Sequence, residues 1–297
     1  MSRSIACTVA FAAFAASIVG SPAGAQLQDN LGALSGDNAK GYLGPLPKAL
    51  SGTLNAAIFQ TGNVPKASVD FTIGVRLMGV AFDDEDRTYR PTDPPGFTSN
   101  GPVDAPTVIG DEQAVAQSGQ GGTTLYHPGG FDIGEFAVAV PQLTIGSVMG
   151  TRAVVRWISL DLGDSDFGRL SLFGFGAQHS ISQYFPGLPV DLAAGVFYQS
   201  FRIDDDLVDT KALHVDVTGS RSLGMLQPYV GVGFDRFDME AEYDDSNSGQ
   251  KIRVDFDTES DAHLTLGALL HLPVVKLHGE LNVASTNGAA IGLSFGR

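Results

Sequence analysis

The sequence is poor in cysteine, tryptophan and basic residues. Its 297 residues include one Cys, one Trp and 18 Lys or Arg, against 33 Asp or Glu, so the formal net charge at pH 7 is −15. Such an acidic chain is not expected to bind nucleic acid, because binding to phosphates depends on Lys and Arg. The single cysteine is Cys7, which lies in an expected signal peptide. The exported chain would therefore have no thiol for catalysis, for a disulfide or for a metal site.

The N-terminus has the pattern of a secretory signal. Arg3 precedes an apolar run at residues 5–19, and the small-residue sequence Ala-Gly-Ala follows at residues 23–25. This order is typical of a cleaved signal peptide, and we predict cleavage after Ala25. No run of 18 or more apolar residues follows, so no membrane-spanning helix is expected. The protein is expected to be exported, and to cross a membrane only as a β-barrel.

From residue 67 onward, apolar and polar residues alternate in long segments, as in Phe71, Ile73 and Val75 with Thr72 and Gly74 between them. A period of two is the signal of a β-strand. Ten such segments are predicted, at residues 68–82, 136–147, 151–161, 167–179, 190–203, 208–220, 227–243, 257–272, 274–285 and 287–296. Most exceed the ~9–11 residues that a tilted strand needs to cross a bilayer, whereas strands of soluble proteins average about 5–6. The prediction is an all-β fold, an antiparallel transmembrane β-barrel of about ten strands, with a soluble periplasmic β-protein as the less favoured reading.

The connections between these segments support the same topology. If the C-terminus lies in the periplasm, the longest connections, 83–135 and 244–256, fall on one side of the barrel, as in outer-membrane barrels. The predicted outer regions also hold 26 of the 33 acidic residues. The long connection 83–135 could hide two further strands, near 105–109 and 122–127, which would give a barrel of twelve.

Residues 26–66 do not alternate. After Pro45 and Pro47 the segment carries a roughly helical apolar stripe, formed by Leu43, Leu46, Ala49, Leu50, Leu54 and Ile58. Two interpretations stay open, a short amphipathic helix that plugs or caps the barrel and a frayed periplasmic tail. The expected organisation is a signal peptide at 1–25, a periplasmic or plug segment at 26–66 and an outer-membrane barrel at 67–297.

Several motifs carry a resemblance to a known family. The most distinctive stretch is residues 173–192, FGFGAQHSISQYFPGLPVDL, and shorter ones are PQLTIG at 141–146 and QPYVG at 227–231. With them, most of residues 40–297 resembles a family of uncharacterised bacterial outer-membrane β-barrel proteins. The resemblance implies the fold and no activity. The architecture is more distantly similar to long-chain fatty-acid transporters, which place an N-terminal hatch inside a larger barrel, and this analogy concerns the fold alone.

Polar residues on the alternating strands are the candidates for a functional lumen. A Lys or Arg that faced lipid at the midplane would cost about 2–4 kcal/mol, so these side chains are expected to face inward. The candidate lumen-lining residues are His214, Asp216, Asp235, His263, Lys276, His278, Glu280 and Asn282. They could form an ion-pair and hydrogen-bond network that fills a narrow barrel, or they could line a polar path or a ligand pocket. Nothing in the sequence brings the histidines together, so a histidine metal site is not expected.

An acidic cluster is the weak candidate for a cation site. Asp83, Asp84, Glu85 and Asp86 follow the first predicted strand, and carboxylate oxygens are ligands for Ca²⁺ or Mg²⁺. The spacing of an EF-hand is absent, and the same charges would keep an exposed loop soluble. No cofactor is expected.

Two further motifs have a structural and a functional interpretation. His179, Ser180 and Ser182 are similar to the His/Ser pairs of membrane lipases, but the expected topology puts them at a periplasmic turn, which favours a capped turn. Phe295 ends the last alternating strand and resembles the aromatic signal that the barrel assembly machinery reads.

The predicted function follows from the strand number. Eight strands give an interior filled by side chains and 16–18 give a wide aqueous channel, so ten strands predict no general porin. The first hypothesis is a narrow outer-membrane conduit or binder for a small molecule, which could be hydrophobic, without enzymatic activity. The alternatives are a structural or surface-interaction barrel with a filled lumen and, less favoured, a lipid-modifying hydrolase. The expected partners are outer-membrane lipid, lipopolysaccharide, the barrel assembly machinery and a small-molecule ligand, with the oligomeric state left open.

Overall fold

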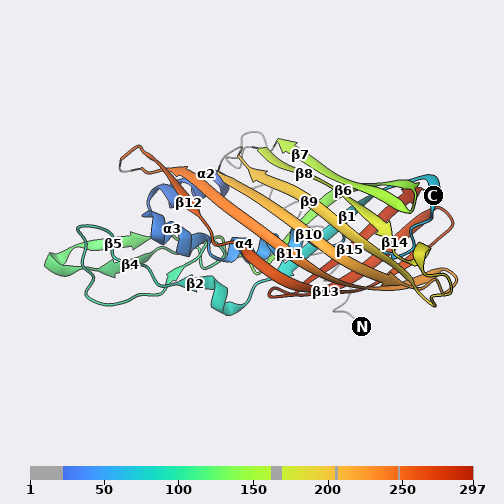
Figure 1. Ribbon diagram of the computed structural model, residues 1–297. Helices are drawn as coiled ribbons and strands as arrows, with labels where there is room; N and C mark the ends of the chain where they lie inside the picture. Colours follow the sequence, from blue (N-terminus) through green and yellow to red (C-terminus); the bar gives the residue numbers. More distant parts are fainter. Residues whose placement is uncertain (1–22, 162–168, 205–206, 247, 297) are drawn as a thin grey trace.

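The computed structural model describes residues 23–161, 169–204, 207–246 and 248–296, and within them ten strands close into one antiparallel barrel (Figure 1). The strands are β1 (Ala67–Ala81), β6 (Glu135–Val148), β7 (Thr151–Asp161), β8 (Arg169–Ser180), β9 (Asp191–Ile203), β10 (Val208–Ser220), β11 (Leu226–Asp244), β13 (Glu259–His271), β14 (Val275–Val283) and β15 (Gly288–Gly296). Each strand pairs with the next one in this order, and β15 pairs with β1 to close the barrel. An extra strand, β12 (Lys251–Asp255), pairs with the end of β11. The prediction of ten strands is confirmed, and each predicted segment overlaps one of them.

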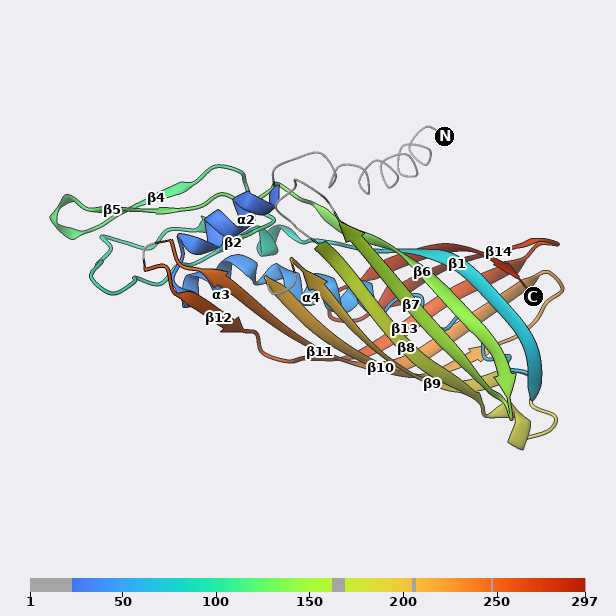
Figure 2. The ribbon, with the colours of Figure 1, turned by 90° about the horizontal axis from the view of Figure 1, so that it is seen from above.

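The twelve-stranded alternative is wrong. The two extra segments form β3 (Ala105–Pro106) and β5 (Thr124–His127), which pair with β2 (Thr88–Tyr89) and β4 (Val115–Ser118) and not with the barrel. They have two and four residues, too few to cross a bilayer. The β4–β5 hairpin projects away from the barrel (Figure 2).

The outer face of the barrel is apolar. Along β11, Val230, Val232 and Phe234 are exposed, whereas Tyr229 and Asp235 point inward and are buried. The same alternation exposes large apolar side chains on the other barrel strands, for example Ile73 and Val75 on β1. Such a continuous apolar surface is not sustained in water and is the lipid-facing band of a transmembrane barrel.

The two ends of the barrel differ in their connections. We call one end the turn end, because its connections are the short segments 149–150, 181–190, 221–225 and 272–274. The other end, which we call the loop end, carries the 82–134 segment. In the shortest connection Met149 and Gly150 both have positive φ, 52° and 76°. This is the conformation of the tight type I′ turn, which suits the twist of the strands that it joins.

The N-terminal segment is helical and then extended. Helices α2 (Ala23–Gly32), α3 (Gly36–Leu43) and α4 (Pro45–Leu54) lie at and inside the loop end, where the Tyr42 carbonyl accepts a bond from Val108. Their apolar side chains, among them Leu43 and Leu54, form the main buried core with the inner faces of the strands. In the described residues, no helix is long and apolar enough to span a membrane. The predicted helical segment before the barrel is confirmed, and the frayed-tail interpretation is wrong.

Residues 55–66 thread the lumen to the turn end. There Gly150 N donates to the Lys66 carbonyl at 2.8 Å, and Ser147 donates to the Pro65 carbonyl. The predicted apolar stripe continues to Ile58, but the helix ends at Leu54, and Ala57 has a φ of 53°. Beyond the helix end, the carbonyls of Leu54 and Ala56 and the N–H of Ala57 bond to side chains of the barrel wall, so the helical bonding pattern does not continue. We call residues 55–66 the lumen segment.

One seam of the wall is less completely paired. The register between β6 and β7 runs from Val148–Thr151 to Gln142–Arg156 and ends there, whereas β6 pairs with β1 as far as Glu135. The next residue of β6 is Pro141, which has no N–H to donate to a neighbouring strand. The loop-end half of this seam is therefore the part of the wall with the fewest cross-strand bonds among the described strands.

The lipid-facing band can be tested with one charge at two depths. Val232 lies six residues into β11 from the turn end, about 15 Å along the barrel axis at the usual rise and tilt, and is thus close to the midplane. We expect Val232→Arg to lower the free energy of unfolding by about 2–4 kcal/mol. The measurement is urea unfolding in lipid vesicles, followed by the fluorescence of Trp157.

The control is the same substitution in the turn between β13 and β14. Val274 is 74% exposed there, and Val274→Arg is expected to cost about 0–1 kcal/mol because the charge stays in the interface. Equal costs at the two positions would contradict the assignment of the band.

Candidate functional site: the threaded lumen

Arg156 on β7 holds the lumen segment where it leaves α4. This side chain is fully buried, and its two terminal nitrogens donate to the carbonyls of Leu54 at 3.0 Å and Ala56 at 2.8 Å. Its Nε donates to Gln142 at 2.7 Å, and Gln142 in turn donates to the Ile58 carbonyl. The guanidinium thus uses its fixed fork of donors to bind backbone oxygens that have no helical partner.

Glu280 on β14 holds the next part of the segment from the opposite wall. One of its carboxylate oxygens accepts the backbone N–H of Ala57 at 2.6 Å, and the other accepts the hydroxyl of Tyr229 at 2.7 Å. Asn282 also donates to Glu280, at 2.9 Å. The buried carboxylate is thereby satisfied, and it supplies the negative charge opposite Arg156.

A chain of hydrogen bonds runs on from Asn282 through three strands. Asn282 Oδ1 lies 2.8 Å from His263 Nε2, and His263 Nδ1 lies 2.7 Å from Asp235 Oδ2. The other oxygen of Asp235 lies 2.5 Å from His214 Nδ1. Because the amide of Asn282 donates to Glu280, its oxygen faces His263, which must donate from Nε2. His263 is thus bonded through both ring nitrogens, to Asn282 and to Asp235.

The same residues are the candidate for a metal. Of the residues that the structure describes, His214, Asp235 and His263 form the one group of three possible ligands whose atoms gather within 4.8 Å. Ligand atoms on a tetrahedral zinc ion lie roughly 3.3 Å apart, given metal–nitrogen distances of about 2.0–2.1 Å. The two His–Asp distances, 2.5 and 2.7 Å, are hydrogen-bond lengths instead. The arrangement therefore fits a proton-sharing network better than a metal site.

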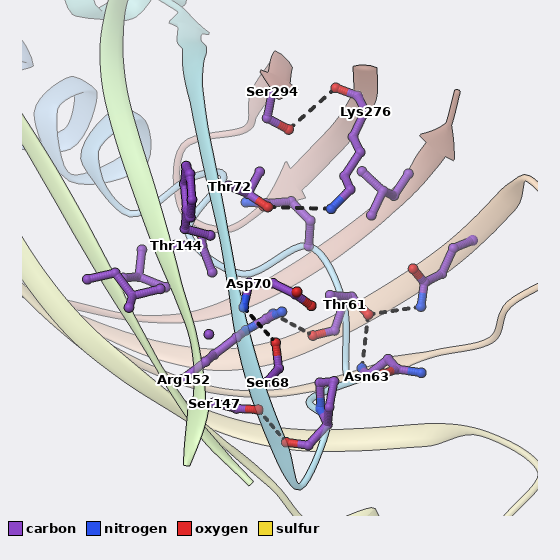
Figure 3. Close-up of a pocket in the computed structure, with 18 of the residues that line it drawn as sticks. Thr61, Asn63, Ser68, Asp70, Thr72, Thr144, Ser147, Arg152, Lys276 and Ser294 are labelled. Atoms are coloured by element: carbon purple, nitrogen blue, oxygen red, sulfur yellow. Dashed lines mark hydrogen bonds between the residues drawn. The ribbon is translucent and has the colours of Figure 1, made fainter. Parts of the chain in front are cut away.

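A cavity of about 330 Å³ opens at the turn end, beside residues 58–65 of the lumen segment (Figure 3). Arg152 reaches from β7 and donates to the Thr61 carbonyl at 3.1 Å, and Lys276 reaches from β14 toward the Thr72 hydroxyl at 3.4 Å (Figure 3). The buried Arg76 from β1 also lines the cavity. We call this space the turn-end pocket.

The whole sequence of the chain matches one protein family. A model described as a family of unknown function, DUF6588, matches residues 1–297. The chain belongs to this DUF6588 family. The resemblance to an uncharacterised family of outer-membrane barrels is thereby confirmed. No curated protein matches the sequence.

Solved structures similar to the DUF6588 chain are barrels. A de novo designed transmembrane β-barrel is 20% identical over 50% of this chain and 93% of its own, with a TM-score of 0.27. A loop-deletion mutant of OmpT, an outer membrane protein of Vibrio cholerae, is 9% identical over 78% and 100%, with a TM-score of 0.28. The toluene transporter TbuX of Ralstonia pickettii is 10% identical over 80% and 90%, with a TM-score of 0.28. At these scores and identities, the likenesses carry no argument about what the DUF6588 chain does.

The eight candidate lumen residues of the DUF6588 barrel lie on the inner faces of its strands. Five of them, His214, Asp235, His263, Glu280 and Asn282, belong to the single hydrogen-bonded network described above. The other three make no hydrogen bond to it among the described residues. Asp216 accepts a hydrogen bond from Thr218, His278 is buried beside Gly292, and Lys276 lies in the turn-end pocket.

The acidic cluster lies at the loop end. Asp84 to Arg87 form a short 3-10 helix, η1 (Asp84–Arg87), and Asp86 accepts the backbone N–H of Asp83 at 3.4 Å. Asp83 and Asp86 close the start of η1, where Asp83, Asp84 and Glu85 are exposed and Asp86 is half-buried.

Sequence reasoning missed the arginines of the lumen. Arg76, Arg152 and Arg156 occupy the polar phase of β1 and β7, and a charge facing lipid costs as much for Arg as for Lys. Like Lys276, these arginines could therefore have been assigned to the lumen from their sequence positions. What no sequence pattern could show is that they bind the backbone of the chain's own N-terminal segment.

The role of Arg156 can be tested by amide exchange. We expect Arg156→Met to remove bonds to two carbonyls and to lower the local opening free energy by about 3 kcal/mol. The protection of the lumen-segment amides, such as that of Ala57, would then fall about 100-fold. Gln199→Met, which removes one bond to the Leu54 carbonyl, is the milder variant and should give a smaller loss.

The matched control is Arg202→Met. Arg202 makes an exposed ion pair with Asp209, and such pairs contribute about 0–1 kcal/mol. The same loss of lumen-segment protection in this variant, or unchanged protection in Arg156→Met, would contradict the role given to Arg156.

Proposed function

We propose that the protein is an outer-membrane barrel that passes a small molecule when its lumen segment moves, without enzymatic activity. One observation carries this proposal. A separate stretch of backbone, the lumen segment, runs through the lumen between the inward-facing side chains of the wall. The segment is held by hydrogen bonds to wall side chains, as at Arg156, Glu280 and Ser220, and Ile58 and Phe59 also pack on the wall. Water can replace such bonds when the segment leaves, whereas it cannot replace packed apolar side chains at similar cost.

The orientation in the membrane follows from the connections. Outer-membrane barrels have short periplasmic turns and longer outer loops, so the turn end would face the periplasm. The expected signal peptide would end at Ala25, which leaves the first residues of the exported chain in α2, at the loop end. The N-terminus would then lie outside, with the chain threaded inward through its own barrel.

The partners proposed from the sequence fit this orientation. The apolar band would contact membrane lipid, and the acidic loop end would meet lipopolysaccharide. Phe295 points outward from β15 beside β1 and is 47% exposed, as suits a signal that the barrel assembly machinery could read.

The contacts of His179 support a structural role for the His179–Ser180 motif. The Nδ1 atom of His179 lies 2.7 Å from the Thr151 hydroxyl, and Nε2 lies 2.9 Å from the Tyr184 hydroxyl. Ser180 accepts a hydrogen bond from the backbone of Gln183. These bonds tie the β8–β9 connection to the neighbouring turn, as a capped turn requires, and they do not pair His179 with Ser180.

We call the lumen segment, in its proposed role of opening the barrel when it moves, the gate. A disulfide that fixes the segment to the wall tests this role. Thr61 of the lumen segment and Ser220 of β10 have their hydroxyl oxygens 3.2 Å apart, and the chain has no cysteine besides Cys7. We expect reduced Thr61→Cys/Ser220→Cys protein in planar bilayers to open occasionally, and Arg156→Met in the same background to open more often. Oxidation should abolish both conductances, because the bridge fixes the segment to the wall, and reduction should restore them.

The single variants Thr61→Cys and Ser220→Cys are the controls and should not respond to oxidation. Silence of all the reduced proteins, with the barrel intact by its heat-modifiable gel migration, would contradict the gate and favour the alternative of a structural barrel with a filled lumen. Conductance that persists after oxidation would show a path that does not depend on the segment.

A further inference from the structure

The turn-end pocket has a charge opposite to that of the rest of the protein. The chain carries 33 acidic and 18 basic residues. Yet Arg76, Arg152 and Lys276 line this pocket, and among the described residues that line it Asp70 is the one carboxylate. Cations gathered in a cleft with low-dielectric walls attract anions strongly, because the walls focus the field.

Two of these cations have hydrogen-bond donors to spare. Arg76 is 3% exposed, and its bonds to the Leu293 carbonyl and to Gln60 are long, at 3.5 and 3.4 Å. The Nε atoms of Arg76 and Arg152 are buried, and no described residue accepts a hydrogen bond from them. A buried guanidinium with unused N–H groups is costly, and the cost is relieved by an anion that accepts from it.

Lys276 adds a third donor from the facing wall. Among the described residues its side chain has one hydrogen bond, to the Thr72 hydroxyl at 3.4 Å, and it lies close enough to Asp70 and to Arg152 to interact with both charges. Repulsion between these two cations would fall if a negative group lay between them.

The remaining lining sets the size and character of the ligand. The cavity, about 330 Å³, lies at the small end of the range for ligand sites. Its walls also include the apolar side chains of Ile58, Val154 and Leu269. The space therefore suits an acid group attached to a small apolar body.

We propose that the turn-end pocket binds a small organic anion, whose acid group accepts hydrogen bonds from Arg76, Arg152 and Lys276. Carboxylate and phosphate groups both match the fork of a guanidinium, so the acid group is defined by that shared geometry. The inference does not rest on the gate, because the site exists with the lumen segment in place and is tested at equilibrium.

The test is calorimetric titration of the full protein in detergent with three probes. They are benzoate, its neutral isostere benzamide, and inorganic phosphate. We expect benzoate to bind at least about tenfold more tightly than benzamide, and more weakly as salt rises, because charge carries the interaction. Binding of phosphate alongside benzoate would support an acid-group site, and binding of benzoate alone would identify a carboxylate site.

Variants assign the binding to the pocket. Lys276→Met should weaken benzoate about tenfold and Lys276→Arg should largely retain it, since the charge remains. Arg152→Gln should weaken it to a similar degree and keeps the proposal testable if one variant fails to fold. The matched control is Lys211→Met, which removes an exposed lysine at the loop end and should change nothing.

Four results would overturn the proposal. The first is binding of benzamide as tight as that of benzoate. The second is no binding of benzoate or phosphate. Binding of phosphate alone would leave an inorganic anion site and remove the apolar part of the inference. An equal loss of benzoate affinity in Lys211→Met and Lys276→Met would place the binding elsewhere.

Discussion

The rest of the structure depends on the contact between the wall's buried charges and the backbone of the lumen segment. A charge inside a low-dielectric barrel is tolerated only when it is paired and its hydrogen-bonding groups are used. Arg156 meets this condition through the carbonyls of Leu54 and Ala56, and Glu280 meets it through the N–H of Ala57. The segment in turn needs these side chains, because its own backbone groups have left the helix and would otherwise be buried without partners. Without the other, the wall and the lumen segment would each leave buried polar groups without hydrogen-bond partners.

This mutual dependence constrains how the barrel is built. Residues 55–66 run from the loop end to the turn end inside the barrel. β1 starts at the turn end and runs back in the wall, antiparallel to the lumen segment. The seam between β1 and β15 joins the two ends of the strand sequence and closes the ring. The segment has to be inside before that seam is complete, since α2 to α4 would not follow it through a closed barrel.

The strands were predictable because each has one face toward lipid and one face toward a polar interior. Lipid outside and a polar interior make the period of two sharp, as in β11, where Val230, Val232 and Phe234 face out and Tyr229 and Asp235 face in. The lumen was less predictable because its contacts are non-local. His214, Asp235 and His263 meet only through the registers that pair β10 with β11 and β11 with β13, and those registers are not visible in single strands. The helix that ends at Leu54 illustrates the same limit, since the apolar stripe continues while the backbone partners change.

The distribution of charge links the two ends of the barrel. The acidic residues concentrate at the loop end, around η1 and the tip of β11, whereas Arg76, Arg152 and Lys276 lie in the turn-end pocket. If the pocket binds an anion as proposed, this distribution would repel it at the loop end and attract it at the turn end. Between the two ends, the β6–β7 seam next to Pro141 is the part of the described wall with the fewest cross-strand hydrogen bonds. With the turn end in the periplasm, the field alone would retain an anion on the periplasmic side of the lumen segment. Movement of the segment would then decide whether the anion stays there, and the same residue, Thr61, would take part in both, since it lines the pocket and is bonded to Arg152.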